Sequence, residues 1–165
     1  MIMAGSDQTM EAITAAVVRG RGGDVDGARS DLEALWSEIG VGGDPFHRCT
    51  LAHYLADLYD DAAVALVWDV RALDAADALG DERAQQHHAS LQVAAFYPSL
   101  HLNLADNFRR LGSFDAAADH LARAEDRCTA LPDDAYGEMI RAALADVRRA
   151  VDQHRTERLS SAPGS

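Results

Sequence analysis

The chain has 165 residues, of which 48% are hydrophobic and 6% aromatic, and its formal net charge is −12 at pH 7. This length and apolar content predict one globular domain with a buried core. The negative charge argues against a nucleic-acid partner or an anionic membrane surface, because anionic phosphates attract clustered cations. No apolar run approaches the roughly 20 residues that cross a bilayer. The amino-terminal residues also lack the pattern of a secretion signal, so we expect a cytoplasmic protein.

The composition also indicates the type of secondary structure. Alanine is abundant, aromatic residues are few, and all fifteen basic residues are arginine. Such a composition suits closely packed helices. Cys49 and Cys128 lie in separate helical patterns without a CxxC spacing, so we expect two reduced, buried thiols.

Two helices are expected at the amino-terminal side of the chain. Ser6 or Asp7 can cap the first, and the glycines within 20–23 end it. Asp24 can start the second helix, which ends before the glycine-rich loop at 40–45.

The middle of the chain predicts two further helices and an extra segment. Pro45 suits the first turn of a helix, which we expect at 45–59. A fourth helix is expected at 62–79. The segment 82–97 contains no helix breaker before Pro98. It is therefore either part of one helix kinked at the proline or a separate helix.

Residues 98–125 form the most recognisable unit. An apolar helix side recurs at helical spacing and consists of Leu100, Leu104, Phe108 and Leu111. Gly112 then stops this first helix of the unit. Ser113 then offers an N-cap, and small residues such as Ala117 let a second backbone approach closely. The sequence of leucine, small and aromatic positions, a leucine–glycine turn and two spaced alanines resembles the tetratricopeptide repeat (TPR). The resemblance implies a helix–turn–helix unit that serves as an interaction scaffold.

A last helix is expected at 132–158, with a polar back that suits the cap of a solenoid. We expect 1–6 and 159–165 to be disordered, which leaves 7–158 as a single TPR-like domain. The predicted fold class is all-α: a right-handed α-solenoid of about three irregular TPR-like helical hairpins with a C-terminal capping helix.

The TPR resemblance implies a concave groove that binds a peptide or partner protein. The residues expected to line it are Phe46, Thr50, His53, Asp57, Ser99, Asn103, Asp106, Arg109 and Arg110. Asn103 stands where many repeats of this family place an asparagine that bonds the ligand backbone. We expect Arg109 and Arg110 to form an exposed pair that binds a carboxylate, although arginines in a last helical turn also complement the helix macrodipole.

A metal centre is not expected. His53 and Asp57 lie four residues apart and share a helix face, but a third ligand would have to come from another helix. We interpret them as a pair that shapes the groove. The chain has no nucleophile elbow, P-loop or dinucleotide fingerprint, so neither a cofactor nor catalysis is expected.

The leading functional hypothesis is a protein–protein interaction adaptor whose partner is a protein or peptide. One alternative is a self-associating structural subunit that buries the groove against its own copy. The other is a small-ligand or metal-dependent enzyme.

Overall fold

The computed structural model describes the backbone of residues 7–82 and 87–160. It describes the side chains of residues 7–79 and 94–160. The described residues form seven α-helices, and no strand occurs among them. The helices are α1 (Gln8–Arg21), α2 (Val25–Ile39), α3 (Pro45–Ala56), α4 (Ala62–Glu82), α5 (His87–Arg110), α6 (Phe114–Asp126) and α7 (Ala135–Asp152), with one 3₁₀ turn, η1 (Cys128–Ala130), before α7. The predicted all-α class is confirmed. The segments 1–6 and 161–165, predicted to be disordered, lie outside the described residues.

Aspartate side chains define the starts of five helices. Each accepts a hydrogen bond from a backbone N–H of the first turn: Asp7, Asp24, Asp44, Asp61 and Asp134. These bonds satisfy donors that the helix itself leaves unpaired. Ser113 occupies the N-cap position of α6 as predicted, but its side chain makes no capping hydrogen bond.

A single residue with a positive φ angle follows the end of each of the helices α1, α5 and α7. Gly23 and Gly112 have φ angles of 108° and 78°, and they end α1 and α5 at the predicted places. Glycine adopts this left-handed conformation without steric cost. His154 takes the same role after α7 with φ of 52°, and the N–H of Arg155 bonds to the carbonyl of Ala150 at 2.9 Å. The predicted extension of the last helix to 158 is therefore wrong.

The predicted helix at 45–59 is also too long. After Ala56 the backbone tightens, because the N–H groups of Leu58 and Tyr59 bond three residues back, to Leu55 and Ala56, at 3.0 and 3.3 Å. This i→i+3 pattern is typical of a frayed last turn.

Helix α4 continues past its predicted end at 79 to Glu82, and residues 87–97 belong to one helix with the unit that follows them. From His87, α5 continues through Pro98 to Arg110. Pro98 is buried within it and has no N–H to donate to the helix.

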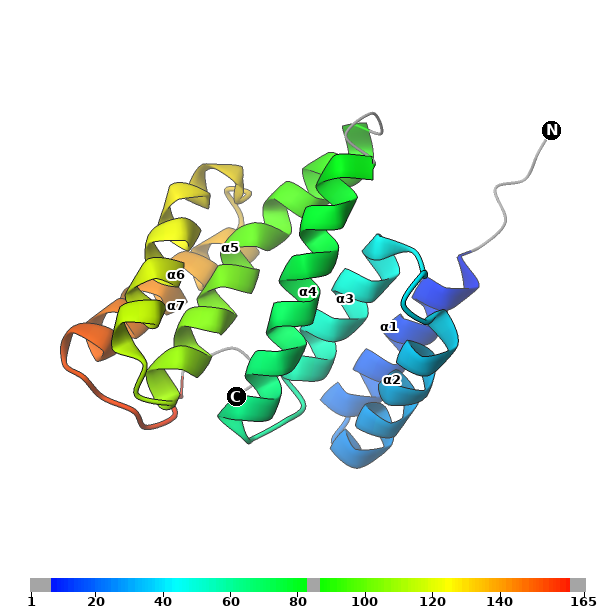
Figure 1. Ribbon diagram of the computed structural model, residues 1–165, viewed down its shortest axis with the longest axis horizontal. Coiled ribbons are helices and arrows are strands. Elements are labelled where there is room, and N and C mark those ends of the chain that lie inside the picture. The colour runs from blue at the N-terminus through cyan, green and yellow to red at the C-terminus, as the bar shows by residue number, and fades with distance from the viewer. Residues whose placement is uncertain (1–6, 83–86, 161–165) are drawn as a thin grey trace.

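Consecutive helices pack in pairs: α1 with α2, α3 with α4, and α5 with α6. Helix α4 also packs against α5, and α7 packs against both α5 and α6. Figure 1 shows the α1–α2 pair at one end of the molecule, α3–α4 in the middle, and α5, α6 and α7 at the other end. Within the described residues, no helix has the length and apolar composition of a membrane span.

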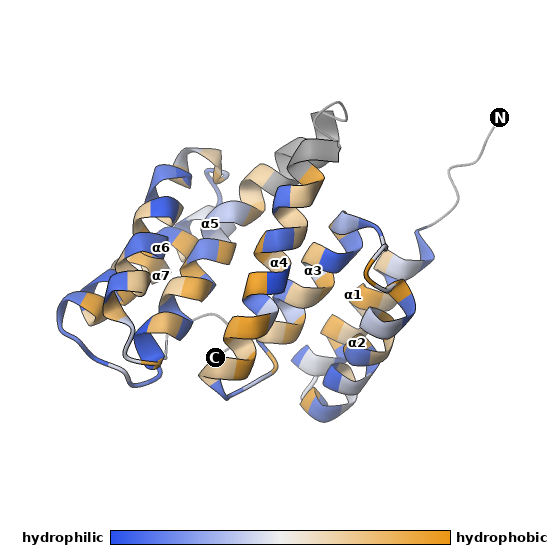
Figure 2. Ribbon diagram, in the orientation of Figure 1, coloured by the Kyte–Doolittle hydropathy of each residue, from blue (hydrophilic) through white to orange (hydrophobic). Residues whose placement is uncertain are grey.

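Two apolar clusters hold the helices together. The first joins α1–α4 to the middle of α5, and includes Ile13, Leu32, Leu55 and Leu100. The second joins α5, α6 and α7, where Figure 2 shows hydrophobic and hydrophilic segments alternating along α6 and α7. Ala117 of α6 is fully buried there, as predicted from its small side chain.

Some predicted core positions differ. Leu111, expected on an apolar helix side, is 45% exposed because α5 has already ended at Arg110. Trp68 is buried and Trp36 packs against the same cluster, with their rings edge to face at 5.1 Å. Cys49 is a buried free thiol, whereas the free thiol of Cys128 is only partly buried.

After α7 the chain returns toward the middle of the molecule as a non-helical segment, which we call the C-terminal strap (residues 153–160). Phe114 stacks on His154 with ring centroids 4.5 Å apart. Leu159 is partly buried against the second cluster. Arg158 reaches Asp60, in the connection between α3 and α4, at 2.5 Å.

Candidate functional site

Helix α5 carries a layer of buried polar side chains into the interior. Its members on α5 are Ser99, His101, Asn103, Asp106, Asn107 and Arg109. The neighbouring helices add the buried polar residues Thr50 and His53 of α3 and Asp69 of α4. Buried polar groups require hydrogen-bond partners to offset their lost hydration. The partners of this layer show what each residue contributes.

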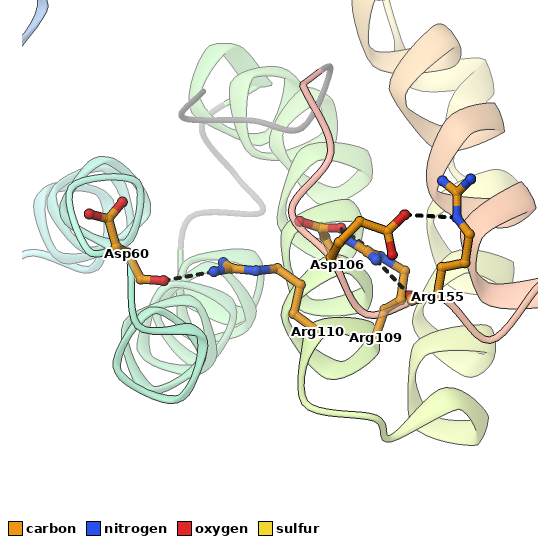
Figure 3. A network of polar contacts seen from close by, with 6 residues as sticks. Asp60, Asp106, Arg109, Arg110 and Arg155 are labelled. Carbon is orange, nitrogen blue, oxygen red and sulfur yellow. Dashed lines mark hydrogen bonds and ion pairs between the residues drawn. The ribbon is translucent and has the colours of Figure 1, made fainter.

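Arg109 binds the backbone of the C-terminal strap. It is fully buried, donates two hydrogen bonds to Asp106 Oδ1 at 3.0 and 2.8 Å, and donates a third to the carbonyl of Arg155 at 2.7 Å. Arg110 points the other way and donates to the carbonyl of Asp60 at 2.7 Å, as Figure 3 shows. The expectation that Arg109 and Arg110 form an exposed pair is therefore wrong. Each guanidinium binds a backbone carbonyl of this chain in a non-helical segment.

His53 links α3 to α5. Its Nε2 lies 3.2 Å from Ser99 Oγ, and its Nδ1 lies 3.4 Å from Asn103 Nδ2. Burial lowers the pKa of His53 to about 4, so the imidazole is neutral at pH 7. Its hydrogen bonds go to α5 rather than to Asp57, the partner that the sequence spacing suggested.

Three oxygens of the layer have no hydrogen-bond partner among the described residues: Thr50 Oγ1, Asp69 Oδ1 and Asn103 Oδ1. Asp69 accepts a hydrogen bond from Asn107 Nδ2 through Oδ2 at 2.6 Å, but its Oδ1 is unpaired, as is Oδ1 of Asn103. Both residues line a cavity of about 20 Å³. The other lining residues are Ala56, Asp57, Tyr59, Ala65, Asp106, Asn107, Arg110 and Arg158.

Burial raises the pKa of two carboxyl groups at this cavity. It raises the pKa of Asp57 to about 7, and the cations Arg158 and Arg21 oppose that rise. The pKa of Asp69 lies well above its usual value, first through burial and then through the negative charge of Asp57. Carboxyl groups in such surroundings exchange protons closer to neutral pH than ordinary aspartates do.

A larger groove of about 770 Å³ adjoins the cavity, because Asp57 and Arg158 line both. It lies between the α1–α2 pair, α3 and the strap. Its remaining lining residues are Val17, Gly20, Arg21, Val25, Asp26, Arg29, Leu32, Tyr54, Leu58 and Asp60. Apolar side chains with a few charged groups of both signs are typical of ligand and peptide sites.

The structure brings most predicted site residues together and shows others that the sequence did not indicate. Ser99 and Asn103 both bond to His53. One cavity is lined by Asp57, Asn103, Asp106 and Arg110. Thr50 is buried with an unpaired hydroxyl, whereas Phe46 packs against the first apolar cluster. Sequence reasoning missed Asp69, Asn107, Arg155 and Arg158. Asp69 had a signal: it is the one charge in an otherwise apolar stretch of α4, 62–70.

The described residues contain no group of three or more His, Cys, Asp or Glu side chains placed to hold a metal ion. The site instead presents hydrogen-bond acceptors, protonatable carboxyls and two arginines that bind carbonyls. Comparisons with known proteins give no match: no family model, no curated protein and no solved structure matches the chain.

Proposed function

We propose that this protein is a peptide-binding module of the helical-repeat type. In this proposal the three helix pairs form a short TPR-like solenoid capped by α7, and an extended segment of a partner protein binds along the inner side of α3 and α5. The observation that carries the proposal is the hydrogen bond from Arg109 to the carbonyl of Arg155. A side chain on α5 thereby binds the main chain of a non-helical segment, as a peptide groove does.

The partner we propose is a basic extended peptide that resembles the strap. The strap contributes arginines at 155 and 158, and Arg158 lines the adjoining groove and pairs there with Asp60. Asp26, Asp57 and Asp60 line that groove together with Arg21, Arg29 and Arg158, so its lining carries both signs of charge equally. The net charge of −12 on the whole chain favours a cationic partner over an acidic one.

Titration of the full-length chain with a labelled peptide of the strap sequence, QHRTERLS, tests this proposal. The strap competes from within the same chain, and a tethered competitor has a high effective concentration. Arg158→Ala weakens the strap's contact with Asp60, so we expect it to tighten binding of the added peptide. In this proposal Arg110 exchanges the carbonyl of Asp60 for a carbonyl of the bound peptide, so Arg110→Ala should weaken binding. Each lost charge-assisted hydrogen bond is worth about 1.5–3 kcal/mol.

Arg149→Ala is the matched control, because it makes the same charge change on the exposed side of α7, where the Arg149 side chain is 65% exposed. Binding that falls equally in Arg149→Ala and Arg110→Ala would mean diffuse electrostatic attraction. Binding that is indifferent to both Arg110→Ala and Arg158→Ala would refute the groove.

A self-associating subunit is a second candidate function, favoured by one surface of α4. Val64, Val67 and Val70 follow one another at three-residue spacing and are 37%, 48% and 49% exposed. Exposed aliphatic side chains in a row favour contact with another protein surface. Sedimentation of the wild type and of Val67→Asp over a concentration series decides this: a monomer at all concentrations removes the candidate.

A further inference from the structure

The unpaired oxygens Asp69 Oδ1 and Asn103 Oδ1 call for a donor. Asp69 is 1% exposed and Asn103 is 4% exposed, so bulk water does not hydrate these side chains. An unpaired buried acceptor costs folding free energy, on the order of 1–3 kcal/mol. Since both residues line the same small cavity, one donor placed there would satisfy both.

The size of the cavity limits what that donor is. A volume of about 20 Å³ accommodates one water-sized centre. An ammonium nitrogen is of that size and carries three N–H donors, whereas a guanidinium is planar, larger and carries five. Asp69 Oδ1, Asn103 Oδ1 and the carboxyl group of Asp57 supply three acceptors at the cavity.

The chain does not supply this group itself. It contains no lysine, so it has no side-chain ammonium. The two arginines at the rim, Arg110 and Arg158, direct hydrogen bonds to Asp60. Arg109, the third nearby cation, is bonded to Asp106 and to the strap.

We propose that the cavity between α3, α4 and α5 binds a primary ammonium group from outside the chain, either a small alkylamine or the side chain of a lysine. The ammonium donates to Asp69, Asn103 and Asp57. This proposal does not depend on the peptide proposal above, because a small alkylamine would bind the cavity without any peptide backbone.

Charged groups of both signs face this position. Asp57, which follows α3, Asp69 of α4 and Asp106 of α5 line the cavity, and Arg109 pairs with Asp106. Arg110, Arg158 and Arg21 are the facing cations. Because burial raises the pKa values of Asp57 and Asp69, a bound cation favours their ionised forms, and binding releases protons.

Calorimetric titration of the full-length chain with methylammonium chloride, in sodium buffer at pH 8, tests the proposal. We expect saturable binding, and weaker binding at pH 6 by about tenfold, because a carboxyl with a pKa of about 7 is mostly protonated there. Guanidinium and tetramethylammonium should not bind at the same concentrations, since one is too large for the cavity and the other has no N–H. Equal heats for all three ions, or no saturation with methylammonium, would overturn the proposal, and a water would then fill the cavity.

Two substitutions test whether methylammonium binds in this cavity. Asp69→Asn removes the charge without changing the shape, and Asn103→Leu removes the second acceptor. We expect each to weaken methylammonium binding at least tenfold, while Asp126→Asn, the same charge change at an exposed position on α6, leaves it unchanged. Helix content by circular dichroism shows that each variant is folded. Unaltered binding in the folded Asp69→Asn variant would contradict the assignment, and the ion series above tests the wild type without any substitution.

The source of the ammonium is distinguished by a competition. One competitor is a blocked Gly-Lys-Gly peptide, and the other is the same peptide with an Nε-acetylated lysine. Displacement of methylammonium by the first peptide but not by the second identifies a lysine side chain as a ligand. Binding of methylammonium without such displacement identifies free amines. Both results support the cavity site whether or not the strap peptide binds.

Discussion

Helices α5 and α7 lie against each other but bury different kinds of residue. Helix α7 buries Gly137 and otherwise only apolar side chains, among them Ile140, Leu144 and Val147. Helix α5 buries leucines too, but also a histidine, a serine, two asparagines, an aspartate and an arginine. Helix α7 shows what packing alone requires of a helix in this fold, so the polar residues of α5 exceed that requirement.

The polar residues of α5 are therefore the place to look for function. Polar groups inside a protein reduce its stability unless they are fully bonded. In α5 they are not all bonded, since Asn103 and its neighbour Asp69 retain unpaired oxygens. A helix that served only to hold the fold would not need them.

Arg109→Ala should have the largest effect on stability. It leaves Asp106 buried without its cation and the carbonyl of Arg155 without a donor, and breaking a buried ion pair in this way costs about 3–5 kcal/mol. Urea denaturation measures the loss. Surface ion pairs contribute less than about 1 kcal/mol to the free energy of unfolding. A loss no larger than that in Arg109→Ala would mean that the buried ion pair of α5 is worth no more than a surface pair on α7.

Ala117→Leu tests the apolar contact between α5 and α6. Ala117 is fully buried, so the larger side chain must displace its neighbours, at a cost on the order of 1–3 kcal/mol. The denaturation midpoint should fall accordingly. Ala116→Leu, at the adjacent and less buried position of the same helix, provides the control, and equal midpoints for the two variants would contradict close packing at Ala117.

Asp69→Asn should stabilise the protein at neutral pH, within the roughly 0.5–3 kcal/mol of ordinary single substitutions. The folded-state pKa of Asp69 is raised above its unfolded value, so the contribution of this carboxyl to stability is fully present below pH 3.8 and is lost as the pH rises through the folded pKa. An asparagine does not ionise, and its amide can donate to Asn103. The advantage of the variant should therefore grow from pH 4 to pH 8 in thermal unfolding. A constant difference across that range would contradict a raised pKa.

Arg148→Ala should have the smallest effect. Arg148 pairs with Glu125 on the surface between α6 and α7, where the two side chains are 33% and 46% exposed. Exposed ion pairs contribute about 0–1 kcal/mol. A loss as large as that of Arg109→Ala would remove the contrast between the two helices.

Local chemistry made much of the fold predictable. Aspartate caps and glycines in a left-handed conformation mark helix starts and ends in the sequence, and most of these boundaries are confirmed. The end of α7 was missed because His154 adopts a conformation that glycine usually takes. A histidine gives no such signal.

The candidate site was predictable only in part. The repeat resemblance placed Asn103 and Asp106 on one side of α5, and they line one cavity. It could not show that the strap binds Arg109, because that contact joins residues 46 positions apart. Asp69 was missed because tertiary packing, rather than helical spacing, brings it to Asn107.

The bond between Arg158 and Asp60 joins residues 98 positions apart, and it bears on how the protein is made. Helix pairs that contact mainly their neighbours can pack as they leave the ribosome, from the amino terminus onward. The cavity, in contrast, gains Arg158 as a lining residue only after helices α1 to α7 have been synthesised. A truncated chain would therefore carry assembled helix pairs and an unfinished site.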